Sequence, residues 1–184
     1  MPWKHRQKKP FNLKKEILGW SGALAVALVA VFLVHTFLFM MIRVDGRSMQ
    51  QTLQDGDRIA STVLDMKING PTRGTIVLCR YPGNDYFCVK RLIGMPGDTL
   101  KIVDGVTYID GKPLQEPYVA FPEHGSTYGP IHLSEDQYFV MGDNRANSLD
   151  SRSASVGPLK RDELIANVRL RLWPLDRIGM VNAQ

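Results

Sequence analysis

Histidine and cysteine are scarce in this chain of 184 residues, which has four His and two Cys. Two of the histidines, His124 and His132, lie beyond the apolar run that ends at Ile42, and neither stands in a local motif. A Ser/His/Asp triad or a Cys88/His transpeptidase site stays open, because partners in such sites need not be neighbours in the sequence. Two cysteines and two histidines without ligand spacing give no recognisable metal site, and no cofactor is expected.

An excess of positive charge is also missing from most of the chain, although the formal net charge is +5. Residues 1–16 hold six Lys or Arg and one Glu, so the remaining residues hold 17 basic and 17 acidic side chains. These cancel, and nucleic acid is therefore not expected as a partner. The length allows one domain with a small second lobe, and 44% hydrophobic with 22% charged residues indicate a chain that folds.

One long hydrophobic run follows the basic N-terminal tail. Residues 17–42 contain no Asp, Glu, Lys or Arg, and about 20 apolar residues suffice for a transmembrane helix. The alternative is a cleavable signal peptide, but the run is too long and its end is bulky rather than small. The basic tail, residues 1–16, favours an N-terminus in the cytoplasm, which predicts residues 43–184 on the outer side of the cytoplasmic membrane.

Beyond residue 43 the pattern changes to short β-type stretches separated by Gly, Pro, Asn and Asp, as is typical of strands joined by turns. The expected strands are residues 75–79, 86–90, 99–103, 106–109, 137–141 and 166–172. Asp104-Gly105 is a two-residue signal for a type I′ turn, and Asp110-Gly111 marks the next reversal. A short helix is expected over residues 161–165. The sequence thus predicts a mainly β, antiparallel domain on a single N-terminal transmembrane helix.

The two cysteines fall in the first predicted hairpin. If Gly83-Asn84 forms its loop, Cys79 and Cys88 are directly opposed, with Cβ atoms about 4.5 to 5.5 Å apart. This spacing is somewhat wider than a relaxed disulfide prefers. An oxidising exterior favours a bridge, and the alternative is a pair of buried thiols; the sequence leaves both open.

A serine and a lysine are more informative than the histidines. Ser48 follows the apolar run by six residues, and six extended residues reach about 20 Å, so Ser48 is expected near the membrane surface. Lys90 ends the second hairpin strand and shares a face with Cys88 and Leu92, because alternate side chains of a strand share a face. An ammonium on an apolar face is a candidate for a lowered pKa. The plain alternative is a lysine whose head lies in water.

Several separated segments, in this order, resemble those of the type I signal peptidases, which are membrane-anchored Ser/Lys endopeptidases. The similar segments are residues 46–53, 56–59, 90–98, 142–152 and 173–179. The resemblance covers nearly the whole chain from the apolar run onward. It implies a signal-peptidase or self-cleaving-repressor type of β fold, in which residues 99–141 form a small β-rich insertion between the lysine segment and Gly142.

The resemblance implies roles for five side chains. Ser48 is the expected nucleophile, and Lys90, neutralised by burial, is the expected general base. Ser148 is expected to orient the lysine amine, and Asp150 with Arg152 to brace the site as an ion pair. An acyl-enzyme would form on Ser48 and be hydrolysed by water. The implied substrates are precursor proteins with signal peptides, cut after small residues at −1 and −3, and the implied surroundings are membrane lipid.

Two positions depart from the pattern of many family members. Gln51 stands where proline is common, which is expected to loosen the turn after the nucleophile. Gly46 stands where others have a serine whose hydroxyl donates to the oxyanion, so the oxyanion hole is expected to rely on backbone N–H groups such as that of Ser48. Two other readings stay open. One is a self-cleaving repressor, which would need a DNA-binding module in place of the anchor, and the other is a membrane-tethered scaffold domain.

Overall fold

The computed structural model describes residues 20–29, 31 and 39–181. The chain divides into two compact units, residues 1–37 and 38–184. Residues 20–29 and 31 of the first unit are helical. Among the described residues, no helix has both the length and the apolar character needed to cross a membrane. The predicted basic tail lies outside the described residues, as does part of the predicted span, whose last residues from Phe39 onward form a strand rather than a helix.

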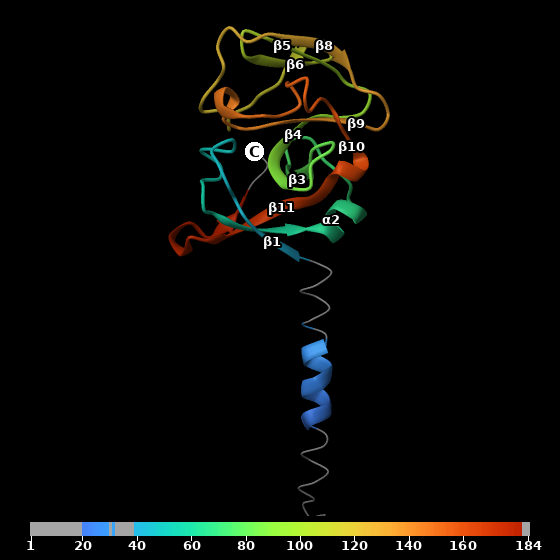
Figure 1. Ribbon diagram of the computed structural model, residues 1–184, viewed down its shortest axis with the longest axis vertical. Helices are drawn as coiled ribbons and strands as arrows, with labels where there is room; N and C mark the ends of the chain where they lie inside the picture. Colours follow the sequence, from blue (N-terminus) through green and yellow to red (C-terminus); the bar gives the residue numbers. More distant parts are fainter. Residues whose placement is uncertain (1–19, 30, 32–38, 182–184) are drawn as a thin grey trace, which may run out of the picture. The chain divides into compact units, whose positions relative to one another are not determined.

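The second unit is mainly β (Figure 1). Its strands are β1 (Phe39–Arg43), β2 (Arg58–Thr62), β3 (Ile76–Arg80), β4 (Phe87–Gly94), β5 (Thr99–Val103), β6 (Val106–Ile109), β7 (Lys112–Pro113), β8 (Tyr128–His132), β9 (Gln137–Met141), β10 (Leu159–Lys160), β11 (Leu164–Trp173) and β12 (Gly179–Met180). Its helical segments are α2 (Val63–Ile68) and the 3-10 turns η1 (Arg145–Asn147), η2 (Arg161–Glu163) and η3 (Leu175–Arg177). The antiparallel, mainly β architecture expected from the sequence is confirmed.

Two sheets make up this unit. The larger sheet runs in the order β1-β2-β11-β3-β4-β9-β10, with β12 paired to β11, and the smaller runs β7-β6-β5-β8. The smaller sheet lies at the top of Figure 1. It ends at His132, and β9 pairs with β4 in the larger sheet. The β-rich insertion is therefore shorter than the predicted residues 99–141.

The smaller sheet follows the predicted turns. Asp104 and Gly105 have φ of 50° and 79°, and Val103 pairs with Val106 across them. Both central residues of a type I′ turn need a positive φ, which Asp tolerates and Gly adopts freely. Asp110 and Gly111 repeat this conformation before β7.

The first hairpin of the larger sheet, β3-β4, has the register that places the cysteines opposite each other. Cys79 pairs with Cys88 and Val77 with Lys90. The connection spans residues 81–86 and is longer than the two-residue loop expected, but the register is unchanged. Both cysteines are free thiols in this structure, so the bridge left open by the sequence is not formed.

The helix expected over residues 161–165 is not formed. Arg161–Glu163 make a single 3-10 turn, and β11 begins at Leu164, which pairs with Cys79 and is 3% exposed. Strand pairing and burial against β3 thus outweigh the local helical pattern. Conversely, the helix α2 was not predicted from the sequence.

Strand β4 divides two clusters of buried side chains. Leu92 packs in one cluster with Cys79 and Val140, whereas Ile93 packs in another with Phe139 and Leu133, beneath the smaller sheet. Alternation along a strand explains this division. It also sends Lys90 and Arg91 to opposite faces of the larger sheet.

Candidate active site

Ser48 lies in a tight turn after β1. Gly46 opens the turn with φ of 91°, in the left-handed region that favours glycine, and its N–H donates to Asp55 Oδ1 at 2.9 Å. The Leu53 N–H donates to the Met49 carbonyl at 2.8 Å, and both side chains are buried. The turn is therefore held by hydrogen bonds and by two side chains anchored in the core. In the described part of the chain, the Ser48 N–H has no hydrogen-bond acceptor.

Ser48 and Lys90 line the same pocket, which has a volume of about 340 Å³. The pocket lies between the nucleophile turn with the end of β1 and the first half of β4, and apolar residues such as Val44 and Val89 contribute to its wall. Lys90 is 5% exposed. No hydrogen-bond partner of its Nζ occurs among the described residues.

Burial lowers the pKa of Lys90 from its ordinary value, because an ammonium loses hydration in the interior. The Asp150 carboxylate opposes this shift, and the Arg152 guanidinium adds to it. The net direction favours the neutral amine. A neutral lysine amine can accept a proton from a hydroxyl, which a charged one cannot.

The loop after β9 rests directly on the nucleophile turn. The Asn144 N–H donates to the Ser48 carbonyl at 3.0 Å, and Asn144 Nδ2 donates to the Arg47 carbonyl at 3.2 Å. Gly142 is the point of closest approach, because a Cβ there would lie 2.3 Å from Ser148 Oγ and 2.4 Å from the Ser48 carbonyl oxygen. Only glycine fits between these groups.

The remaining candidates follow in the same loop. Ser148 Oγ is buried and has no hydrogen-bond partner among the described residues. Asp150 accepts a hydrogen bond from the Gly142 N–H at 3.0 Å and forms an ion pair with Arg152 at 2.9 Å. Burial by itself would raise the pKa of Asp150, but Arg152, with smaller contributions from Ser148 and the Gly142 N–H, outweighs it and lowers that pKa.

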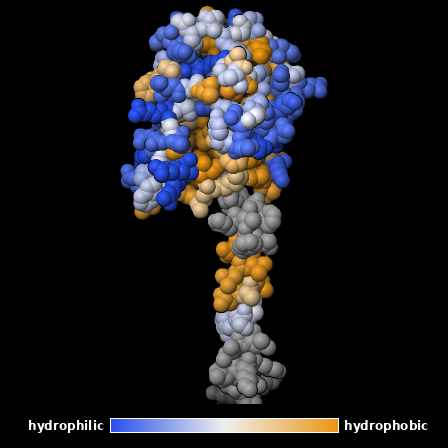
Figure 2. All heavy atoms as spheres, in the orientation of Figure 1, coloured by the Kyte–Doolittle hydropathy of each residue, from blue (hydrophilic) through white to orange (hydrophobic). Residues whose placement is uncertain are grey.

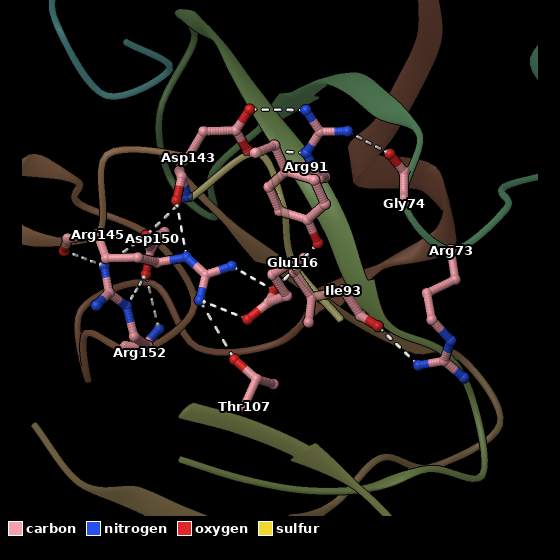
Figure 3. Close-up of polar contacts among 12 residues, drawn as sticks. Arg73, Gly74, Arg91, Ile93, Thr107, Glu116, Asp143, Arg145, Asp150 and Arg152 are labelled. Atoms are coloured by element: carbon pink, nitrogen blue, oxygen red, sulfur yellow. Dashed lines mark hydrogen bonds and ion pairs between the residues drawn. The ribbon is translucent and has the colours of Figure 1, made fainter. Parts of the chain in front are cut away.

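A buried ion pair behind the site was not singled out as such from the sequence. Arg91 donates to both carboxylate oxygens of Asp143, at 2.8 and 2.7 Å, and to the Gly74 carbonyl (Figure 3). Its guanidinium lies 3.8 Å from the centre of the Tyr118 ring. Thr52, four residues after the nucleophile, donates its hydroxyl proton to Asp143. These contacts tie β4, the loop after β9 and the nucleophile segment together.

Two further arginines tie this loop to the segment between β7 and β8. Arg145 pairs with Glu116, which lies near it in Figure 3, and it also donates to Thr107 Oγ1. Arg152 pairs with Glu123 as well as Asp150. Through these ion pairs, Arg145 and Asp143 hold the loop after β9 to neighbouring segments. The glutamates that pair with Arg145 and Arg152 each lie 29 residues earlier in the chain, and no local signal identified them.

Tyr81 is another contact that the sequence did not reveal. It is 3% exposed, and its hydroxyl donates to the Leu149 carbonyl at 2.6 Å. Leu149 stands between Ser148 and Asp150, so this bond ties the end of β3 to the segment that carries both candidates.

His124 and His132, the two histidines in the described part of the chain, do not take part in this arrangement. His132 Nδ1 lies 3.3 Å from Thr99 Oγ1 at the edge of the smaller sheet, and neither His124 nor His132 lines the pocket of Ser48. Among the described residues, no group of three or more His, Cys, Asp or Glu side chains could hold a metal ion. The chemistry that this arrangement supports is nucleophilic attack by a serine that shares its pocket with a buried amine.

The known proteins that this chain resembles are signal peptidases. Residues 17–173 match the family model described as signal peptidase, peptidase S26. The chain belongs to the signal peptidase family. Signal peptidase I of Bacillus amyloliquefaciens is 36% identical over 94% of this chain and 96% of its own length.

Two more members of the family resemble the chain. Signal peptidase I S of Bacillus subtilis is 35% identical over 92% of this chain and 96% of its own length. A crystal structure of a signal peptidase I from Enterococcus faecalis is 32% identical, with a TM-score of 0.46, and covers 53% of this chain and 95% of that one. As a family member, the chain is a peptidase.

Proposed function

We propose that this family member removes N-terminal signal peptides from exported precursor proteins, with Ser48 as nucleophile and Lys90 as general base. The observation that carries the proposal is the shared pocket of about 340 Å³, whose lining includes both Ser48 and a lysine that is 5% exposed. The lowered pKa of Lys90 supports the role of base.

The reaction uses groups that this chain supplies. Lys90 Nζ takes the proton of the Ser48 hydroxyl as Oγ attacks the scissile carbonyl. The Ser48 N–H, which has no acceptor in the described part of the chain, is free to donate to the oxyanion. The protonated Lys90 then gives its proton to the leaving amine. Water hydrolyses the resulting acyl-enzyme, and the lysine again acts as base.

Supporting roles follow from the contacts around the lysine. Ser148 Oγ is buried and unpartnered among the described side chains, so it has a hydrogen bond to offer the amine. The Asp150–Arg152 pair, anchored through the Gly142 N–H, holds the segment that carries Ser148. Asp150 also opposes the fall in the pKa of Lys90.

The substrate is a signal-peptide-bearing precursor, cut after small residues at −1 and −3. The apolar wall of the pocket, which includes Ile42, Val44 and Met49, supports binding of small apolar side chains ahead of the scissile bond. An extended substrate segment is suited to such a pocket, because its alternate side chains point in the same direction.

Membrane attachment belongs to the same proposal. Residues 17–42 would form the single span, with residues 1–16 in the cytoplasm and the catalytic unit outside. The second unit carries an apolar surface near β1 and the end of β11, and Figure 2 shows hydrophobic residues on the lower part of this unit. Side chains at least half exposed there are Met41, Trp173, Leu175, Ile178 and Met180. Such a patch suits contact with lipid.

The topology can be tested on spheroplasts. Protease added from outside should digest the catalytic unit and leave residues 1–16 protected. Protection of the catalytic unit would overturn the proposed orientation without bearing on the chemistry.

The chemistry can be tested by incubating the purified full-length chain in detergent with a model precursor and sequencing the new N-terminus. Ser48→Ala and Lys90→Arg should each abolish cleavage with little change in circular dichroism. Arginine keeps the positive charge but cannot shed its proton in a protein. Ser148→Ala should be milder, because it removes an orienting hydrogen bond rather than a reacting group.

The pH dependence supplies a second readout. Because the pKa of Lys90 is lowered, kcat/KM should rise with pH along an acidic limb whose midpoint lies below the ordinary lysine value. A folded Lys90→Arg enzyme that cleaves at a near-normal rate would contradict the Ser/Lys mechanism.

A further inference from the structure

The two cysteines stand where a thiol pair can act together. Cys79 and Cys88 are directly opposed on β3 and β4, and the Cys79 Sγ lies 3.5 Å from the Cys88 carbonyl oxygen. Opposed residues in antiparallel strands have Cα atoms about 4.5 to 5.5 Å apart, which lies within the range that disulfides span. Both side chains also pack against the same hydrophobic cluster. A bridge therefore needs only a small approach of the two Cβ atoms.

The environments of the two thiols differ. Cys79 is 0% exposed, whereas Cys88 is half-buried and lines the pocket that holds Ser48 and Lys90. A reagent that enters the pocket can reach Cys88 but not Cys79. Burial raises the pKa of the Cys88 thiol, while the neighbouring Lys90 and the Tyr81 hydroxyl act against that shift.

We propose that Cys88 is a site of covalent thiol modification within the catalytic pocket, and that Cys79 is its resolving partner. The structure places the reactive thiol in the pocket wall and the second thiol directly behind it on the neighbouring strand. The effect of this modification on activity rests on the proposed function of the Ser48 pocket.

The chemistry balances with a low-molecular-weight disulfide such as oxidised glutathione as the oxidant. The Cys88 thiolate attacks one sulfur of that disulfide, which forms a mixed disulfide at Cys88 and releases one glutathione thiolate. The Cys79 thiol then loses its proton as its sulfur attacks the Cys88 sulfur, and the departing glutathione thiolate takes up a proton. This step forms the Cys79–Cys88 bridge, releases the second glutathione and transfers two electrons to the oxidant in all.

The two products should affect cleavage differently. A glutathionyl group at Cys88 projects into a pocket of about 340 Å³ and blocks the precursor. The internal bridge adds no atoms to the pocket, because it draws the Cys88 sulfur toward Cys79. Cys79 thus protects the pocket from a lasting adduct.

The test compares the wild type with Cys79→Ala and Cys88→Ala as full-length chains in detergent. Each protein is treated with oxidised glutathione, and its mass and precursor cleavage are compared with those of the same protein untreated. A second variant, Cys79→Ser, covers the case in which Cys79→Ala does not fold, and circular dichroism reports folding. Mass measurements do not depend on catalysis, so failure of this inference is distinguishable from failure of the proposed function.

The wild type should lose two hydrogens in mass and keep its activity within about twofold. Cys79→Ala or Cys79→Ser should gain one glutathionyl group and lose about tenfold or more in cleavage, restored by dithiothreitol. Cys88→Ala should gain no glutathionyl group and keep its untreated rate. Absence of an adduct in both folded Cys79 variants, or an adduct that leaves cleavage unchanged, would overturn the inference.

Discussion

The ion pair between Arg91 and Asp143 leads to a prediction about stability. The Arg91 side chain is 1% exposed and that of Asp143 0%. Asp143→Asn keeps the shape of the side chain but leaves the Arg91 guanidinium charged, buried and without its counter-ion. Loss of one partner of a buried pair costs about 3 to 5 kcal/mol, a large part of the roughly 5 to 15 kcal/mol by which domains are usually stable.

Replacing both partners should restore much of this stability. In Arg91→Met/Asp143→Leu no buried charge is left unpaired, and apolar groups of similar volume often substitute for a buried ion pair at little cost. The Thr52 hydroxyl and the Gly74 carbonyl lose their partners, but both residues are half-buried and within reach of water. We therefore expect the double variant to lie between Asp143→Asn and the wild type.

Urea denaturation followed by circular dichroism measures these differences in the free energy of unfolding. Arg169→Gln is the matched control, because it breaks an arginine–carboxylate pair with Asp65 in which the arginine side chain is 44% exposed. Such pairs contribute about 1 kcal/mol or less. If Asp143→Asn cost no more than Arg169→Gln, the reasoning from burial would be refuted.

Three other predictions concern the catalytic framework. The pKa of Lys90 is lower in the folded chain than its ordinary value of 10.5. Between these two pH values the unfolded chain binds more protons than the folded one, so the free energy of unfolding should rise with pH in this window. Lys90→Met should remove this rise and stabilise the protein at neutral pH, as thermal melts across pH would show; an unchanged pH profile would contradict it. Gly142→Ala should lower kcat by about a hundredfold, because a Cβ at 2.3 to 2.4 Å from Ser148 Oγ and the Ser48 carbonyl must displace one of them. A Gly142→Ala enzyme with normal kcat would contradict this, because it would show that the neighbouring atoms can move aside without loss of activity. Tyr81→Phe removes the hydrogen bond to the Leu149 carbonyl, which holds the segment that carries Ser148 and Asp150. It should therefore lower kcat and shift the pH dependence of kcat with little change in KM. The matched control is Tyr138→Phe, in the same hydrophobic cluster, which should leave the pH dependence unchanged.

Local interactions explain what was predictable about the fold. The turns at Asp104-Gly105 and Asp110-Gly111 need positive φ, and residues that tolerate it occur at those positions. The pairing of Cys79 with Cys88 follows from the symmetry of the hairpin. It was therefore predicted correctly, although the predicted loop was too short. Each of these features depends on residues close together in the chain.

The family resemblance depended on short segments in a fixed order, and the match to the signal peptidase family over residues 17–173 confirms it. The roles of Ser48, Lys90, Ser148, Asp150 and Arg152 stay proposals. The strand pattern predicted that Lys90 shares a face with Cys88 and Leu92, but it did not predict how deeply that face is buried.

By itself, the sequence determined the turns and much of the strand pattern, because these are local properties, and the family resemblance supplied the candidate reacting groups. Only the tertiary structure decided which groups meet. The pairing of Arg91 with Asp143 and of Arg145 with Glu116 joins residues far apart in the chain, and pairing with β3 turned Leu164 into a strand residue. The pocket of Ser48 and Lys90 likewise depends on packing between a turn and a distant strand, whose burial removes water from the lysine and thereby lowers its pKa.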